Sequence, residues 1–312
     1  MAAVAPAPAL PNEDAFLWLG LKALNGTNEW QHSREKQVEQ FRRLYGASAK
    51  ILSLVWNDLS DNDLLFGAKP LHLLVLYRWM LAYQTELELH VLFGLLENTI
   101  RKWNEILLSS VASLRSIKID PHWNDHRDLL LARTVNGIHH AIDEPRPFST
   151  KYSSHKLGGK AGLMYEFVVA TDKPRLLWLN GPFPAATNDI TVFENHGLKQ
   201  AIETIQVNLP AFRVIADDGY YKLSCLDILS YRNELDPREV SWFKDRSLSR
   251  HESFNKLTRN YGCLSERFRN EHTSGNESQE FPTHKACVEA VCVTIQYELD
   301  EGEKTLLDPY PS

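Results

Sequence analysis

The sequence of 312 residues is poor in cysteine and has neither a long apolar run nor an excess of basic residues. Each of these absences argues against one class of protein: zinc-binding proteins, membrane proteins and proteins that bind nucleic acid through their overall charge. The four cysteines are Cys225, Cys263, Cys287 and Cys292, and their spacing matches no zinc-binding pattern. His284 precedes two of them, but the stretch around them is apolar and predicts buried free thiols instead of metal ligands.

No apolar run is long enough to cross a bilayer, so we expect no membrane partner. Residues 1–8 contain no basic residue and are broken by proline, which does not fit a signal peptide. We therefore expect a disordered tail over residues 1–12 and an intracellular protein in a reducing compartment. The sequons at Asn25 and Asn276 then carry no glycan.

The net charge of -6 at pH 7 gives no general attraction to phosphate, because DNA affinity comes largely from lysine and arginine. This weighs against nucleic acid as a partner but does not exclude local basic clusters. The hydrophobic content of 43% is that of a globular protein with a substantial core.

Residues 13–129 show the periodicity of helices. Val38, Phe41 and Leu44 share one face of a predicted helix over 35–45. Thr85 and Glu88 predict the start of a short helix that runs to Gly94, and a further helix follows over about 97–108. This pattern favours a helix-turn-helix over about 70–117, in which Arg101 and Lys102 would contact DNA. A plain helical bundle fits the pattern equally well.

From residue 130 the pattern changes to short β-rich runs separated by glycine, proline and asparagine. The predicted strands are 132–136, 163–171, 175–180 and 212–216. Between the last two we expect a loop through 181–190 and a helix over 198–205.

The remaining elements are two long helices and a tail. Asp236 is expected to cap the first helix, with Pro237 at its first position and Gly262 at its end. The second helix covers about 282–299, and residues 300–312 are expected to be a flexible acidic tail.

Three acids fall where a sheet could gather them. Asp217 directly follows the strand 212–216, Asp189 lies in the loop before it, and Glu252 lies on the first long helix. Metal-assisted phosphodiester cleavage needs hard cations held by carboxylates from separate elements. Singly, each acid has a structural explanation, as a helix cap, a turn residue or a solvated position. Together, in this order, they favour a metal site.

Seven segments in this half of the chain form a family pattern. They are VNGIH at 135–139, EPRPFS at 144–149, KLGGKAG at 156–162, WLNGP at 178–182, NDI at 188–190, DDGY at 217–220 and RHESFN at 250–255. On these segments, the chain from Thr134 to Leu299 resembles the DDE domain of Harbinger-type transposases and of the nuclease-like proteins derived from them.

The resemblance implies an α/β fold with an RNase H-like mixed sheet flanked by helices over 130–299. An all-α helix-turn-helix region would precede it. It also implies DNA cleavage with Mg²⁺ or Mn²⁺, with Asp217 as the second acid of the triad, Glu252 as the third and Asp189 as an additional metal ligand. At the place of the first acid stands Asn136.

An amide oxygen brings no charge, so the clustered negative charge and the Mg²⁺ affinity are both smaller. We therefore expect Asn136 to impair catalysis. Asp143 is a poor substitute, because it lies past the strand in the following loop.

Basic residues near these acids are candidates for contacting the DNA backbone. Lys151, Lys156 and Lys160 share a glycine-bearing loop, and Arg246 and Arg250 share the first long helix. A mixed solvated helix face explains the two arginines equally well. His139 and His140 could orient water, but filling the edge of the sheet is the simpler role.

The leading interpretation is a divalent-metal-dependent DNA endonuclease or transposase of the Harbinger type, impaired at Asn136 and located in the nucleus. The alternative is a transposon-derived DNA-binding or scaffold protein without catalysis. A third possibility is an acid hydrolase that uses Asp217 and Glu252 without metal. By resemblance only, a separate DNA-binding protein encoded by the same element is a further expected partner.

Overall fold

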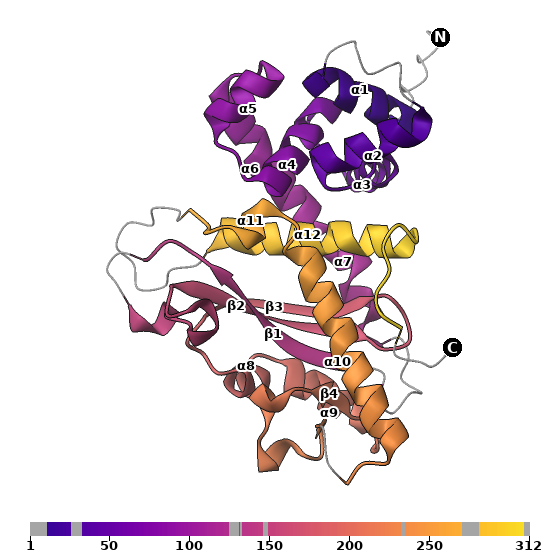
Figure 1. The fold of residues 1–312 in the computed structure, drawn as a ribbon, viewed down its shortest axis with the longest axis vertical. Helices are drawn as coiled ribbons and strands as arrows, with labels where there is room; N and C mark the ends of the chain where they lie inside the picture. Colours follow the sequence, from indigo (N-terminus) through magenta and orange to yellow (C-terminus); the bar gives the residue numbers. More distant parts are fainter. Residues whose placement is uncertain are drawn as a thin grey trace, which may run out of the picture. The chain divides into compact units, whose positions relative to one another are not determined.

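Figure 1 shows the computed structural model, which describes residues 11–25, 33–124, 131, 133–145, 149–231, 235–269 and 281–308. The chain divides into two compact units, Met1–Val111 and Ala112–Ser312. Most of the expected N-terminal tail, the last four residues and the sequon at Asn276 lie outside the described residues.

The N-terminal unit is helical. Its elements are α1 (Glu13–Asn25), α2 (Arg34–Tyr45), α3 (Ala49–Asp61), α4 (Pro70–Ala82), α5 (Glu86–Phe93) and α6 (Glu97–Ser113). Apolar residues at helical spacing form its core, among them Phe41 of α2, Val55 of α3 and Tyr77 of α4, which are fully buried.

Helices α5 and α6 form the helix, glycine turn and helix that the sequence predicts. Thr85 and Glu88 make the predicted capping box, and Gly94 ends α5 with a positive φ of 67°. Arg101 pairs with Glu86 at 3.2 Å, and the Lys102 ammonium lies over the Trp103 ring. Both expected DNA contacts are thus engaged within the unit, and DNA binding by α5 and α6 stays a prediction.

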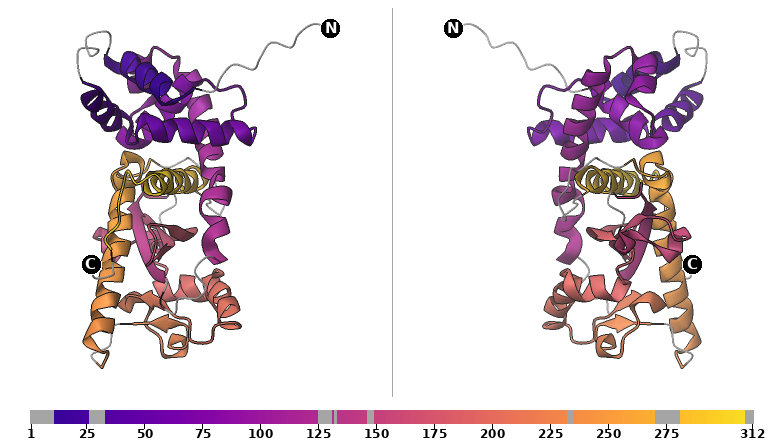
Figure 2. Two further views of the ribbon diagram at one scale, coloured as in Figure 1. Left: turned by 90° about the vertical axis from the view of Figure 1, so that its right-hand side faces the viewer. Right: turned by 90° about the vertical axis from the view of Figure 1, so that its left-hand side faces the viewer.

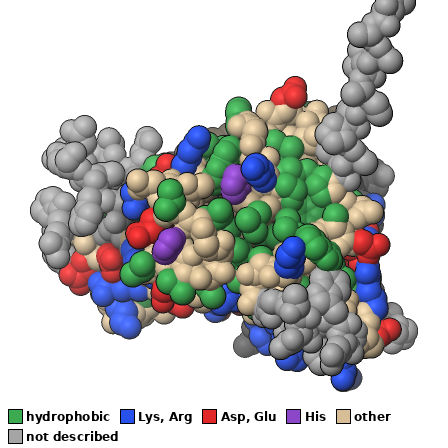
Figure 3. Space-filling view, turned by 90° about the horizontal axis from the view of Figure 1, so that it is seen from above, with side chains coloured by type: hydrophobic (Ala, Val, Ile, Leu, Met, Phe, Trp, Pro, Cys, Tyr) green, Lys and Arg blue, Asp and Glu red, His purple; other side chains and the backbone are tan. Residues whose placement is uncertain are grey.

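The N-terminal helices also expose apolar side chains, which gather in the view from above (Figure 3). The large ones with more than a third of their surface exposed are Trp18, Phe66, Leu87, Val91, Leu92 and Leu96. Three of these six belong to α5, so the outer side of this helix is apolar and not basic.

The C-terminal unit is built on a mixed sheet of five strands in the order β3-β2-β1-β4-β5. The strands are β1 (Arg133–Ala141), β2 (Gly162–Ala170), β3 (Leu176–Pro184), β4 (Val214–Ala216) and β5 (Leu229–Ser230). β2 runs antiparallel to β1 and β3, whereas β1, β4 and β5 are parallel. This register places Ala216, at the carboxyl end of β4, beside Val135 near the start of β1.

Helices cover both faces of this sheet (Figures 1 and 2). They are α7 (Arg115–Lys118), α8 (Asp189–Asn195), α9 (Leu198–Gln206), α10 (Arg238–Thr258), α11 (Gly262–Ser265) and α12 (Pro282–Asp300). Side chains alternate along β1. Thr134 bonds His251 of α10, whereas Val135 packs in a core with Phe193 of α8 and Ile202 of α9.

The structure corrects several sequence-based boundaries. β1 continues past Asn136 to Ala141, and β3 continues to Pro184, so the expected loop after β3 is short. Asp189 is the first residue of α8 and not a loop residue.

The ends of the long helix α10 also differ from the prediction. Asp236 does not cap it; its carboxylate accepts a hydrogen bond from Lys244 Nζ instead. The helix ends at Thr258, and Gly262 begins α11. Leu307 and Asp308 accept hydrogen bonds from arginines of α10, so this part of the expected flexible tail is attached.

The four cysteines are free and buried, as the sequence predicts. No helix in the described ranges combines the length and the apolar character that crossing a bilayer requires.

Candidate functional site

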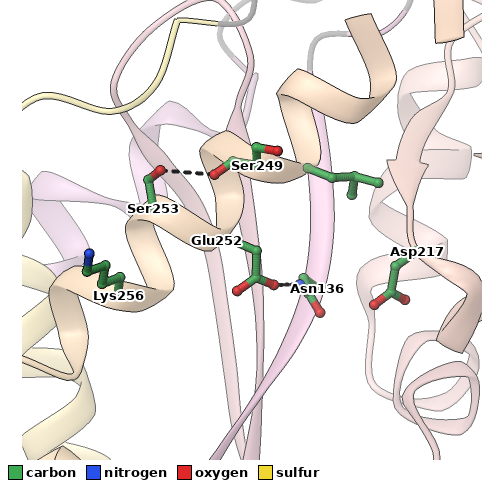
Figure 4. Close-up of a pocket in the computed structure, with 7 residues that line it drawn as sticks. Asn136, Asp217, Ser249, Glu252, Ser253 and Lys256 are labelled. Carbon is green, nitrogen blue, oxygen red and sulfur yellow. Dashed lines mark hydrogen bonds between the residues drawn. The ribbon is translucent and has the colours of Figure 1, made fainter. Parts of the chain in front are cut away.

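Asn136 and Glu252 meet where α10 crosses β1, and we call them the outer pair. Asn136 Nδ2 donates a hydrogen bond of 2.7 Å to Glu252 Oε1 (Figure 4). Asn136 is buried within the sheet, whereas Glu252 is exposed on the helix. A neutral amide therefore satisfies one oxygen of a carboxylate that stays in contact with solvent.

Two further contacts fix α10 against the sheet and so aim Glu252 at Asn136. Thr134 Oγ1 and His251 Nδ1 lie 2.9 Å apart in the core. The Arg250 guanidinium is 5% exposed and donates to the backbone carbonyls of Ala170 and Leu307. These bonds engage the Arg250 guanidinium inside the fold, and a contact of Arg250 with DNA stays a prediction.

Asp217 lies directly after β4, and its Oδ1 accepts a hydrogen bond of 2.9 Å from the backbone N–H of Gly219. Burial raises the pKa of Asp217, and the nearby Asp189 raises it further. Asp217 lines a cleft of about 410 Å³ together with the outer pair, Lys256 of α10 and Leu248, Ser249 and Ser253. Figure 4 shows Asn136 between Glu252 and Asp217.

Asp189 is not among the residues that line this cleft; it is the first residue of α8 and is 6% exposed. Its Oδ2 forms a salt bridge of 3.0 Å with Lys156 Nζ, whereas its Oδ1 has no hydrogen-bond partner among the described residues. A Cβ added at Gly219 would lie 2.7 Å from Asp189 Oδ2 and 3.1 Å from Asp217 Oδ1. Both carboxylates therefore flank this glycine, and a larger residue there would clash with them.

A further acid, Glu166 of β2, was missed by sequence reasoning. It pairs across the sheet with Gly137, whose own added Cβ would lie 2.6 Å from Asp189 Oδ1. Glu166 is fully buried, and neither of its oxygens has a hydrogen-bond partner among the described residues. Burial, reinforced by Asp189, raises its pKa to about 8. We call Glu166, Asp189 and Asp217 the inner acids.

One signal in the sequence could have found Glu166. It is the single charged residue in the otherwise apolar segment GLMYEFVVA at 162–170. A charged residue in the middle of a buried strand usually needs a partner or a function.

The side chains do not fit a site for two cations. In the described parts of the chain, no three His, Cys, Asp or Glu side chains are arranged to hold a metal ion. The reason is visible in the geometry: Glu252 is bonded to the Asn136 amide, and Asp189 is bonded to the Lys156 ammonium. The expected set of Asp189, Asp217, Glu252 and Asn136 is therefore split into an outer and an inner half.

The other candidate residues have assigned neighbours. The Lys151 ammonium lies over the Tyr152 ring, Lys160 is exposed, and Arg246 donates two hydrogen bonds to the Asp308 carbonyl. Asp143, considered as a substitute acid, pairs with Arg267 at 3.0 Å.

His139 and His140 are buried in β1 and do not line the cleft. His139 Nδ1 contacts Ser154 Oγ, and His140 Nδ1 contacts the Leu264 carbonyl. Burial lowers the pKa of each to about 4, so both are neutral at pH 7 and pack in the central strand of the sheet.

Comparison with known proteins gives one match. The family model described as DDE superfamily endonuclease matches residues 135–295. No curated protein and no solved structure matches the chain. The matched range contains β2 to β5 and all of β1 except its first two residues, as well as the outer pair and the inner acids.

Proposed function

Because the chain belongs to the DDE superfamily endonuclease family, we propose that it is a Harbinger-type DNA endonuclease whose metal-dependent cleavage is impaired by Asn136. The fold that this family and the sequence both predict is an RNase H-like mixed sheet, preceded in the sequence by an all-helical region. The family implies DNA as the substrate, and its enzymes typically use divalent metals.

The hydrogen bond from Asn136 to Glu252 is the observation that carries the proposal. Two carboxylates at a separation of 2.7 Å would repel each other unless a cation or a proton lay between them. The amide removes that need, because its N–H group satisfies Glu252 directly. The outer pair is thus stable without Mg²⁺ or Mn²⁺, which are the ions that Asp217, Glu252 and Asp189 would hold in an active relative.

A nicking assay on supercoiled plasmid DNA with Mg²⁺ or Mn²⁺ tests this function. Asn136→Asp restores the missing carboxylate and should raise the rate by roughly two orders of magnitude, the usual worth of one group that stabilises the transition state. Asp217→Asn in the Asn136→Asp background is the control and should abolish the gain. Robust and equal cleavage by the wild-type protein and Asn136→Asp would contradict the proposal.

The second candidate is a DNA-binding or scaffold protein without catalysis, which the internal partners of Glu252 and Asp189, an amide and an ammonium, favour. It would act on DNA in the nucleus, alone or with a separate DNA-binding protein encoded by the same element. DNA binding that persists in EDTA, together with no cleavage by Asn136→Asp at any Mn²⁺ concentration, would favour this candidate.

A further inference from the structure

The inner acids bring together two buried carboxyl groups, those of Glu166 and Asp189, and the half-buried one of Asp217. Asp189 and Asp217 flank Gly219, and Asp189 also lies against Gly137, which pairs across the sheet with Glu166. Glu166 is fully buried with two oxygens that have no hydrogen-bond partner in the described chain, and the same holds for Asp189 Oδ1. Asp189 is buried and one of its oxygens has no hydrogen-bond partner in the described chain; because an uncompensated buried charge is costly, this carboxylate needs a cation.

Lys156 supplies this positive charge. Its ammonium lies 3.0 Å from Asp189 Oδ2, and its charge also lowers the pKa of Asp217 against the raising effect of burial. One lysine thus stabilises the ionised forms of two inner acids. A divalent cation at the inner acids would do the same electrostatic work in the same place.

The segment that carries Lys156 lies at the surface. Lys156 belongs to the short 3-10 turn His155–Leu157, and its side chain is 37% exposed. Gly158 and Gly159 follow with φ of 67° and 83°, and an added Cβ at either would meet no atom within 4 Å. The ammonium is therefore a partly exposed group on a surface turn, and its counter-charge is the buried Asp189.

We propose that Lys156 is a built-in counter-ion that occupies the place of a divalent cation at the inner acids and competes with it. This inference rests on the proposed function, because it treats the inner acids as the remains of a metal site. It explains why the residues do not fit a two-cation site: each half has acquired its own uncharged or cationic partner from the chain. Lys156 acts as a positioning residue through Asp189 and takes no part in cleavage.

Mn²⁺ binding to the metal-free full-length protein, without DNA, tests the inference. Isothermal titration and water-proton relaxation both report binding directly. Lys156→Gln removes the competing charge and should tighten Mn²⁺ binding at least about tenfold, because like charges a few Å apart repel strongly in a partly buried site. Lys156→Arg keeps the charge and should bind Mn²⁺ as weakly as the wild-type protein.

Lys173→Gln is the matched control, since it makes the same change at an exposed lysine on the turn between β2 and β3. It should leave Mn²⁺ affinity unchanged. Lys156→Gln/Asp189→Asn should lose the tightening, because the carboxylate that Mn²⁺ would use is gone.

Three outcomes would overturn the inference: equal Mn²⁺ affinity in wild type and Lys156→Gln, tightening by Lys173→Gln, or tightening that survives Asp189→Asn. Should Lys156→Gln fail to fold, Lys156→Arg with its Mn²⁺ affinity raised at least tenfold over wild type would overturn it as well. These readouts need neither DNA nor cleavage, so they stand or fall independently of the nicking assay.

Discussion

The two halves of the site hold their acids in different ways. In the outer pair, an exposed carboxylate accepts a hydrogen bond from a neutral amide, and solvent supplies the remaining stabilisation. Of the inner acids, Glu166 and Asp189 are buried and lack hydrogen-bond partners at three oxygens in the described chain, Asp217 is half-buried, and Asp189 is paired with Lys156. A change in the outer pair should therefore affect chemistry more than stability, whereas a change at the inner acids should affect both.

The strongest test of this difference joins the two halves. Asn136→Asp/Lys156→Gln supplies the missing carboxylate and removes the competing cation, so its rate of Mn²⁺-dependent plasmid nicking should exceed that of Asn136→Asp by at least about tenfold. Lys156→Gln alone should stay inactive. Steady-state nicking rates of the four proteins form a double-mutant cycle that measures the coupling.

If the rate effects of the two substitutions are merely additive, or the double variant gains less than this over Asn136→Asp, the comparison between the two halves fails. Such a result would mean that Lys156 does not limit metal binding at the site. Asp217→Asn in the double variant is the control for a contaminating nuclease. It should return the rate to that of the wild-type protein.

The second prediction concerns the buried Glu166. Its pKa in the folded protein is raised to about 8, above the value near 4.5 of an exposed glutamate. Between these pH values the folded state keeps a proton that the unfolded state has lost. The free energy of unfolding therefore falls as pH rises from about 5 to about 8, by up to about 1.4 kcal/mol per pH unit for this group.

Glu166→Gln removes the titrating group and should reduce this pH dependence. The free energy of unfolding of the variant should therefore rise relative to that of the wild-type protein by a few kcal/mol between pH 5 and pH 8. Urea unfolding at a series of pH values measures it. Glu203→Gln, the same change at an exposed position of α9, should leave the pH dependence as it is. A constant difference between Glu166→Gln and wild type across the pH range would mean that Glu166 is already ionised in the fold.

Much of the sheet could be predicted from the sequence, because apolar runs bounded by glycine and proline mark β2, β3 and β4. The second half of β1 could not. Gly137, His139 and His140 look like a loop, and only the tertiary contacts of the two histidines with Ser154 and Leu264 make them acceptable in a buried strand.

The site was predictable as a set of residues but not as two halves. The order of Asp189, Asp217 and Glu252 along the chain points to one sheet edge, and the structure brings Asp217 and Glu252 to one cleft. The salt bridge of Lys156 to Asp189 joins residues 33 positions apart on different elements. No local pattern specifies such a contact, since it depends on how the 3-10 turn packs against α8.

The third prediction isolates the outer pair without DNA. Asn136→Asp replaces the hydrogen bond to Glu252 with a pair of like charges and should lower the free energy of unfolding in EDTA by about 1 kcal/mol. Because a cation between the two carboxylates offsets this repulsion, Mn²⁺ should restore the melting temperature of Asn136→Asp more than it raises that of wild type. Asn136→Ala, which lacks both the amide and the charge, should be destabilised without any response to Mn²⁺.

The smallest effect is expected at Lys256, which lines the cleft beside Glu252 and is exposed. Because it is exposed, its ammonium can contact a DNA phosphate, whereas Lys156 is held by Asp189. Lys256→Ala should weaken DNA binding about equally for all sequences and reduce the slope of log affinity against log salt by about one. Fluorescence anisotropy at several salt concentrations measures the slope, with Lys173→Ala as the matched change at an exposed lysine outside the cleft. An unchanged slope for Lys256→Ala, with a reduced slope for Lys156→Ala, would reverse the roles of the two lysines. It would show that Lys156 leaves Asp189 to contact a DNA phosphate.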